Sequence, residues 1–258
     1  MIIPTWKKLG SSTHQLAQTI GAKTAAQTQN IDDKKATHTG TLDPMAEGIV
    51  VVLTGADRFK KGTFTNWKKT YEFEILFGVT TDSHDLLGLQ TKLSHNPLTS
   101  LKIKKKLLSV LPRYIGKQTQ TQPQFSAQRI NGKSGFDLGK TNNNFSQKKN
   151  SIEIFSLQLF STQEILISEL KKNCTNKIAT VTGNFRQKEI TENWNQTFKN
   201  LEQNSIKTLP VFKLVATVSK RTYIRALVHE FSTALQVPAT TYSITRIQEG
   251  PYSKKNFL

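Results

Sequence analysis

The sequence predicts an α+β fold arranged around a mixed β-sheet. Residues 71–77 alternate in polarity, with Glu72 and Glu74 between aromatic and aliphatic side chains, which is typical of a half-buried strand. Residues 222–236 predict a helix, because an apolar stripe at helical spacing is formed by Ile224, Leu227, Val228, Phe231 and Leu235. Strands and helices follow one another without the regular alternation of βαβ units, which favours the α+β class.

The first half of the chain is expected to contain two helices and two strands. Residues 11–20 predict a helix whose N-cap is Ser11 or Ser12. The β-branched run at 49–54 indicates a buried strand, and the half-buried strand described above follows it. Residues 99–111 are rich in Lys and Leu and predict a helix that ends before the next residue, a proline, because the position before a proline disfavours helical backbone.

The second half is expected to begin with an irregular segment. Residues 113–150 carry Gln, Asn, Lys and Gly with few apolar side chains, and they predict a basic, mobile excursion. Strands are predicted near 152–160 and 211–218, and the helix over 222–236 comes last. Residues 165–208 are polar, and their pattern predicts no definite element.

The charge of the chain points to a polyanionic partner. Its 258 residues include 36 Lys and Arg against 18 Asp and Glu, a formal net charge of +18. Such an excess suits nucleic acid, whereas the scattered placement of the basic residues disfavours a membrane surface. No apolar run reaches the roughly 18 residues of a membrane span. Cys174 has no second cysteine to pair with, which fits a reducing compartment, and we expect a cytoplasmic protein.

The segment over residues 38–48 carries the strongest chemical signal. It reads HTGTLDPMAEG, so that a carboxylate precedes a proline between two glycines. One interpretation makes Asp43 a helix N-cap and Pro44 the first helical residue. The other holds Asp43 on a rigid loop as a nucleophile or base. The residues alone leave both open.

Six segments, in chain order, resemble motifs of the TruB family of pseudouridine synthases. Residues 40–48 resemble its G-[TA]-L-D-P-x-A-x-G motif, and residues 219–225 (SKRTYIR) resemble S-x-G-T-Y-I-R with Arg221 in place of the glycine. The other four are KKLGSS at 7–12, with Lys8 where proline is usual, KTY at 69–71, TDSHDLLG at 81–88, and QPQFSAQRINGK at 122–133, with Arg129 where the family's flexible thumb has a lysine.

The resemblance implies a catalytic set of three residues. By this resemblance, Asp43 is expected to be the nucleophile of a reaction that detaches uracil from its ribose, turns it and rejoins it through C5. A carboxylate suits this role because it is ionised at neutral pH without a separate base. The resemblance further implies that Arg225 forms an ion pair with Asp43 and that Tyr71 stacks on the target base. The sequence leaves open whether Asp43 attacks C6 of uracil or C1′ of ribose, or promotes a glycal route.

The resemblance also implies how RNA is held. The target uridine is flipped out of its loop, and His38 fills the space that it leaves. Tyr223 lines the pocket, and Phe125 anchors the thumb near the cleft. The residues expected to contact phosphates are Lys7, Lys8, Lys220, Arg221 and Arg129. For each of these positions the alternative is structural: a surface histidine, a packed aromatic ring or a solvated basic face.

The resemblance implies the pseudouridine synthase fold, a mixed, largely antiparallel sheet with flanking helices and a central RNA-binding cleft. We expect residues 1–258 to form one catalytic domain, with the thumb at 113–150, a polar insertion at 165–208 and no C-terminal PUA domain. The expected activity is conversion of uridine 55 in the T loop of tRNA to pseudouridine by a monomer without an obligatory protein partner, metal or cofactor. The alternatives are the catalytic subunit of an RNA-guided particle and an RNA-binding tRNA folding factor whose catalysis is dispensable.

Overall fold

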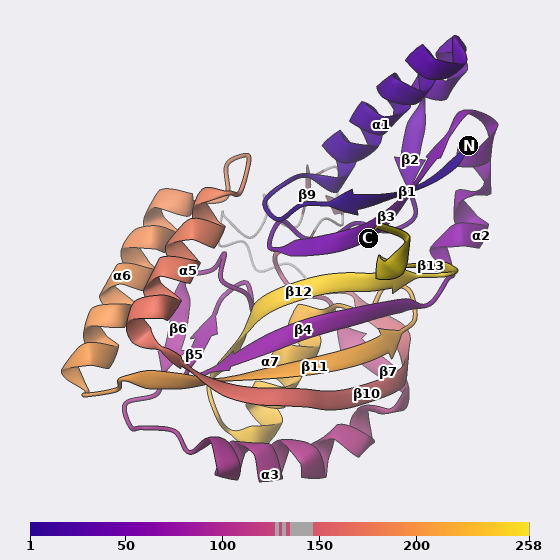
Figure 1. Ribbon diagram of the computed structural model, residues 1–258. Helices are drawn as coiled ribbons and strands as arrows, with labels where there is room; N and C mark the ends of the chain where they lie inside the picture. The colour runs from indigo at the N-terminus through magenta and orange to yellow at the C-terminus, as the bar shows by residue number, and fades with distance from the viewer. Residues whose placement is uncertain (127–128, 131–132, 135–146, 258) are drawn as a thin grey trace.

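A computed structural model describes residues 1–126, 129–130, 133–134 and 147–257 (Figure 1). In these residues a nine-stranded sheet follows the order β1–β3–β12–β4–β11–β10–β7. These strands are β1 (Ile2–Lys7), β3 (Ala46–Thr54), β12 (Ala239–Glu249), β4 (Lys69–Phe77), β11 (Thr208–Val218), β10 (Lys149–Leu166) and β7 (Gly116–Thr121), while β2 (Ala36–His38) pairs with β3 and β13 (Tyr252–Ser253) with β12. Only β12 and β3 pair in parallel within this sheet, so the expected mixed, largely antiparallel α+β fold is confirmed.

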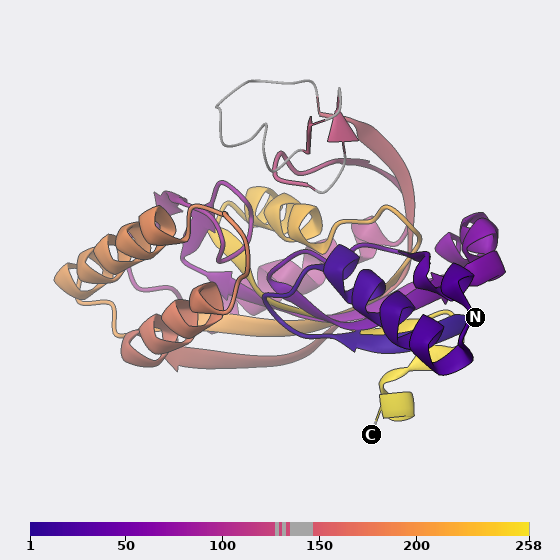
Figure 2. The same ribbon diagram turned by 90° about the horizontal axis from the view of Figure 1, so that it is seen from above.

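Helices flank this sheet. They are α1 (Thr13–Thr28), α2 (Lys61–Thr65), α3 (Ser100–Val110), α5 (Ile167–Ala179), α6 (Gln187–Gln203) and α7 (Ile224–Leu235). The short 3-10 turns are η1 (Ile31–Lys34), η2 (Gly55–Lys60), η3 (Leu111–Tyr114) and η4 (Lys254–Phe257), and the short strands outside the sheet are β5 (Val79–Thr81), β6 (Gln90–Leu93), β8 (Arg129–Ile130) and β9 (Lys133–Ser134). The helices α1 and α7 lie on the same side of the sheet (Figure 2).

The main core lies between the central strands and α7. The alternation over 71–77 is confirmed, since Phe73 and Ile75 are fully buried against the apolar stripe of α7. Burial of each of these side chains stabilises the folded state by about 1.5–3 kcal/mol. The predicted N-cap of α1 is also confirmed, because the hydroxyl of Ser12 accepts the amide of Gln15. The core therefore forms where the sequence pattern is strongest.

Residues 165–208, for which the sequence predicts no element, are mostly helical. They contain the end of β10, an antiparallel hairpin of α5 and α6, and the start of β11. The hairpin has a second core, whose fully buried members include Leu170, Cys174, Ile190, Trp194, Phe198 and Leu201. Its apolar residues are three or four apart and separated by polar ones, so the average composition hides a helical stripe.

The segment 113–150 is structured at both ends. Residues 116–121 form β7, which pairs with residues 149–154 of β10, so the expectation of a mobile excursion is wrong there. Pairing on one edge of the sheet supplies backbone hydrogen bonds without requiring an apolar sequence. The rest of the expected excursion, at 127–128, 131–132 and 135–146, lies outside the described residues. Within the part of the chain described, none of the helices has the length and apolar character needed to cross a membrane.

Candidate active site

Asp43 lies on a loop between β2 and β3 that is held on both sides of Asp43 by hydrogen bonds from Thr13 and Gly10. The hydroxyl of Thr13 donates a hydrogen bond to the carbonyl of Leu42 at 3.1 Å and accepts one from the amide of Leu42 at 3.0 Å. The amide of Gly10 donates to the carbonyl of Pro44 at 2.9 Å. Since Ala46 begins β3, no helix follows Asp43, and the interpretation of Asp43 as a helix N-cap is wrong.

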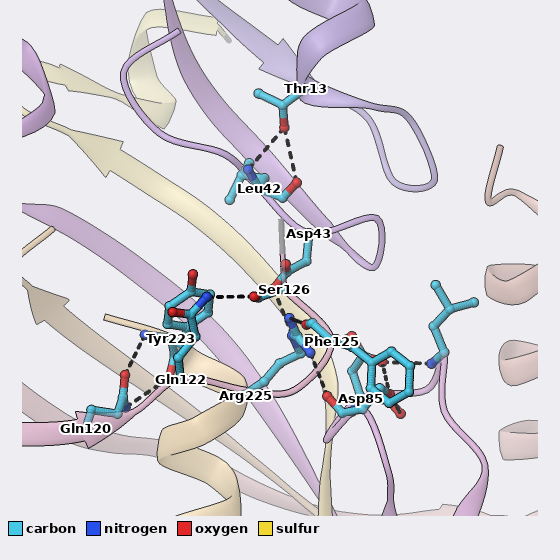
Figure 3. Close-up of polar contacts among 12 residues, drawn as sticks. Thr13, Leu42, Asp43, Asp85, Gln120, Gln122, Phe125, Ser126, Tyr223 and Arg225 are labelled. Atoms are coloured by element: carbon cyan, nitrogen blue, oxygen red, sulfur yellow. Dashed lines mark hydrogen bonds and ion pairs between the residues drawn. The ribbon is translucent and has the colours of Figure 1, made fainter. Parts of the chain in front are cut away.

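Arg225, in the first turn of α7, binds the Asp43 carboxylate. Its Nε lies 2.8 Å from Asp43 Oδ2, while Nη1 donates to the carbonyl of Ser83 at 2.6 Å and Nη2 to that of Phe125 at 2.8 Å (Figure 3). The Arg225 side chain is 1% exposed and that of Asp43 is 18% exposed. The pair is therefore largely shielded, but the carboxylate keeps an open side.

A second carboxylate faces the same guanidinium. Asp85 Oδ2 lies 3.5 Å from Arg225 Nε, and Asp85 Oδ1 accepts the hydroxyl of Ser83 at 2.6 Å and the amide of Leu87 at 2.9 Å. Burial raises the pKa of Asp85, although Arg225 opposes that shift. Burial also works against the charge of Arg225, but Asp43 and Asp85 outweigh it and raise the pKa of Arg225 above its ordinary value. Arg225 therefore stays charged.

Tyr71 shares a cavity with Asp43. The cavity measures about 570 Å³, and its lining includes Asp43, Tyr71, Tyr223, Lys220, Arg221 and Arg246. Tyr71 is 8% exposed, and burial raises the pKa of its phenol. The structure thus brings together Asp43, Arg225 and Tyr71, which lie far apart in the sequence.

A buried ionic cluster behind Tyr71 is missed by the sequence reasoning. Arg246 donates to the carbonyls of Ile49 at 2.5 Å and Gly40 at 3.1 Å, and its Nη1 lies 3.5 Å from the Tyr71 hydroxyl. The carboxylate of Glu249 pairs with Arg246 at 3.3 Å and with Lys69 at 3.6 Å. Burial lowers the pKa of Lys69 to about 8. The sequence does contain a signal for this cluster, because Arg246 occupies an inward-facing position of the alternating strand β12.

Lys7 is placed differently from the expected phosphate contact. Its side chain is fully buried, and Nζ donates to the carbonyls of Ala46 at 2.6 Å and Asp43 at 3.1 Å. Burial lowers the pKa of Lys7 to about 8. In this structure Lys7 therefore holds the loop of Asp43 and does not present its charge at the surface.

Two other residues expected to contact phosphates, Lys220 and Arg221, line the cavity, and a third, Arg129, has a side chain outside the described residues. Lys220 is exposed, lines the cavity and donates to the Asn66 amide oxygen at 2.5 Å. Arg221 has φ +65°, the left-handed region that favours glycine, which accounts for the glycine usual at this motif position. The backbone of Arg129 lies in β8, and its side chain is outside the described residues.

His38 lines a second hollow, which shares Thr41, Leu42 and Asp43 with the first cavity. This hollow measures about 420 Å³ and is lined by both His38 and Asp43, together with residues at the start of α1. Burial lowers the pKa of His38 to about 4, and nearby Lys61 adds to the shift. His38 is therefore neutral at physiological pH, and its Nδ1 is buried without a hydrogen-bond partner among the described residues.

Phe125 and Tyr223 lie where the irregular segment meets the body. Phe125 is 6% exposed, its carbonyl accepts from Arg225, and the Arg186 guanidinium lies 4.8 Å from its ring centroid. Tyr223 lines the cavity beside Asp43, and its backbone amide and carbonyl are both bound by the side chain of Gln120. Burial raises the pKa of Tyr223 to about 12.

Comparison with known families decides the relationship. The profile described as "TruB family pseudouridylate synthase (N terminal domain)" matches residues 28–180. The chain belongs to the TruB family. The tRNA pseudouridine synthase B of Oceanobacillus iheyensis is 28% identical over 99% of this chain and 67% of its own length, and that of Treponema denticola is 30% identical over 98% and 60%. That of Aquifex aeolicus is 35% identical over 52% and 45%, so the chain spans roughly half to two thirds of these family members.

Solved structures support the fold. A chain in the crystal structure of a Cbf5–Nop10–Gar1 complex superposes with a TM-score of 0.52 at 15% identity, over 98% of this chain and 50% of that one. A chain in an H/ACA RNP bound to a substrate RNA containing 2′-deoxyuridine gives 0.51 at 16% identity, over 100% and 50%. At this identity the likeness shows the fold alone, and it agrees with the TruB family assignment.

Proposed function

We propose that this protein is a tRNA pseudouridine synthase that converts uridine 55 of the T loop to pseudouridine. The observation that carries the proposal is the Asp43–Arg225 ion pair at 2.8 Å beside a cavity that also contains Tyr71. Membership of the TruB family and the tRNA pseudouridine synthase B relatives support this substrate. The cavity, at about 570 Å³, has a size ordinary for a small-molecule site and suits a single flipped nucleotide.

In the proposed reaction Asp43 is the nucleophile. Arg225 orients the carboxylate through Nε and pairs with it in a shielded site. The reaction is an isomerisation: the bond from C1′ to N1 of uracil breaks, a bond from C1′ to C5 forms, C5 loses its proton and N1 gains one. Attack at C6, attack at C1′ and the glycal route all place Asp43 beside the uridine.

The flipped base is proposed to stack on Tyr71, with Tyr223 on another wall of the cavity. His38, neutral because of its lowered pKa, fills the space left in the RNA loop at no cost of burying a charge. Lys220 and Arg221 at the mouth are proposed to contact phosphates. Lys7 and Arg246 act by holding the loop that carries Asp43.

The test is Asp43→Asn, which keeps the shape of the side chain and removes its charge. We expect turnover of an unmodified tRNA transcript to fall by about 10⁴-fold or more, because the nucleophile is lost. RNA affinity should remain nearly unchanged, since phosphate contacts supply most of it. Asp32→Asn is the matched control, because Asp32 is exposed on η1 and does not line the cavity.

Pseudouridine mapping completes the test. Formation of pseudouridine at position 55 by the purified wild-type protein, without a guide RNA, separates the proposal from an RNA-guided activity. Measurable turnover by a folded Asp43→Asn protein would show that Asp43 is not the nucleophile. Wild-type activity on tRNA also separates an enzyme from a folding factor that only binds.

A further inference from the structure

An exposed aromatic ring lies on the segment that leads into the cavity wall. Phe59, on η2, is 77% exposed, the largest exposed fraction among the large apolar side chains of the described residues. Two residues later, Lys61 begins α2 and lines the cavity. We call residues 58–61 the rim segment. A single exposed apolar side chain is ordinary, so the surroundings of Phe59 must decide whether it serves a purpose.

The surroundings of Phe59 are cationic and fixed. The Arg58 guanidinium lies 4.2 Å from the centroid of the Phe59 ring, and Arg58 Nη1 donates to the carbonyl of Gly55 at 2.9 Å. Lys60 is tethered to Asp57 at 2.8 Å. Between residues 57 and 69 the sequence carries five basic residues and one acidic residue. The ring is therefore held with one face against a cation, in a local field that attracts anions.

The rim segment lies beside His38 as well as the cavity. Lys61 Nζ donates to the hydroxyl of Thr37 at 3.2 Å, and Thr37 precedes His38 in β2. The charge of Lys61 contributes to lowering the pKa of His38. Figure 1 shows α2 next to the end of the sheet that contains β1, β2 and β3. An RNA loop whose uridine enters the cavity therefore passes close to the rim segment.

We propose that Phe59 is a stacking platform for an unpaired base of the substrate RNA, outside the catalytic cavity, with Lys60 and Lys61 contacting the adjacent phosphates. An aromatic face among Lys and Arg residues is the arrangement by which proteins hold unpaired bases, because every base has a π-face and every linkage is anionic. The helix α2, which follows the rim segment, is anchored by aromatic contacts of Phe64 with Trp67 at 4.9 Å and of Trp67 with Tyr252 at 6.0 Å. The inference rests on the proposed function, since it assumes that RNA enters the cavity.

The experiment compares Phe59→Ala and Phe59→Trp with wild type on an unmodified tRNA transcript. Stacking on one base predicts that Phe59→Ala weakens binding by about 5- to 150-fold and raises KM correspondingly, while kcat at saturating RNA stays the same. Phe59→Trp should retain the affinity of wild type, and its new indole should be quenched when RNA binds. Phe160→Ala and Phe160→Trp are the matched controls, because Phe160 is 73% exposed on β10, near the opposite edge of the sheet from β1 and β3.

The outcomes distinguish the two proposals. If wild type forms pseudouridine but Phe59→Ala has the affinity and KM of wild type, the platform is overturned and the proposed function stands. If wild type forms no pseudouridine on tRNA, the proposed function fails regardless of Phe59. A change in kcat instead of KM, or no quenching with Phe59→Trp, would likewise overturn stacking. Circular dichroism of each variant establishes that the fold is retained.

Discussion

Arg225 joins three parts of the chain that are distant in sequence. Its donors bind the side chain of Asp43, the carbonyl of Ser83 and the carbonyl of Phe125. An arginine that is 1% exposed must have its hydrogen-bond donors satisfied, because an unpaired buried charge costs several kcal/mol. Each of the three contacts therefore helps to keep the other two in place. Replacement by Lys would lose this geometry, since an ammonium cannot present a planar fork.

At the same scale, a stacked histidine pair predicts acid sensitivity. His84 and His229 stack with ring centroids 4.0 Å apart, and His229 lies one helical turn after Arg225. Burial lowers the pKa of His84 to about 3, and the charges of His229 and Arg225 add to the shift. Between the ordinary value near 6.5 and about 3, the unfolded chain binds a proton that the folded chain does not. Stability from this group is therefore full above pH 6.5 and falls as the pH decreases.

We expect His84→Asn to reduce this pH dependence. Asn tolerates the φ of +63° at this position, so the backbone can be kept. Between pH 7 and pH 5 the free energy of unfolding of wild type should fall by about 1–2 kcal/mol more than that of the variant. Urea denaturation at the two pH values measures the difference, and His14→Asn, on the exposed side of α1, is the control. Parallel losses in wild type and His84→Asn would contradict the assignment to His84.

At the scale of elements, the α5–α6 hairpin supports the turn that holds Arg225. Trp194 Nε1 donates to the carbonyl of Leu86 at 3.0 Å, and Arg186 pairs with Asp82 at 3.0 Å. The hairpin also reaches the loop before α1, where the amide of Thr182 donates to the carbonyl of Gly10 at 3.0 Å. A segment that the sequence marks only as polar thus braces two of the elements that surround Asp43.

Arg186→Ala tests this bracing. The variant loses the ion pair with Asp82 and the contact with the ring of Phe125. Since the pair is partly exposed, the loss should be about 1 kcal/mol, seen as an approximately fivefold lower kcat for pseudouridine formation. A purely structural role would lower the unfolding free energy and leave the kcat of the folded fraction unchanged. Arg186→Lys should recover part of kcat, and Lys188→Ala, on the exposed face of α6, should match wild type.

The elements that the sequence predicts well are those with dense patterns. The stripe of α7 and the alternation at 71–77 bury large side chains at every inward position, so periodicity alone is sufficient. The apolar stripe of the α5–α6 hairpin around Trp194 is interrupted by many polar residues, so its period is hard to detect. Strand β7 forms because it pairs with β10, and a local sequence pattern cannot predict such pairing. The Asp43–Arg225 contact spans 182 residues, so only the resemblance to a family predicts it. The residues alone do not exclude Asp43 as a helix N-cap. The structure excludes it, because the chain continues from Asp43 into strand β3 and not into a helix.

At the scale of the whole molecule, charge is distributed unequally between inside and outside. Buried cations have specific partners: Arg225 pairs with Asp43 and Asp85, and Arg246 and Lys69 share Glu249. The excess of +18 therefore belongs mainly to the surface, where it attracts a polyanion over long range. Four basic residues line the cavity with their side chains near its mouth: Lys61, Lys148, Lys220 and Arg221. Specific pairing inside fixes the site, and we expect the excess charge outside to attract the proposed RNA substrate to it.

This distribution predicts a steep dependence of RNA affinity on salt. If the four cavity-mouth cations each neutralise one phosphate, log K should fall with log salt at a slope of about −3, between the values for single and double strands. Raising salt fourfold should then weaken tRNA binding by about 50- to 150-fold. Equilibrium titrations with Asp43→Asn protein measure binding without turnover. Lys220→Ala should reduce the slope by about 1, whereas Lys104→Ala, exposed on α3 and not lining the cavity, should leave it unchanged. An affinity that stays flat with salt would mean that RNA shape, and not surface charge, supplies most of the binding.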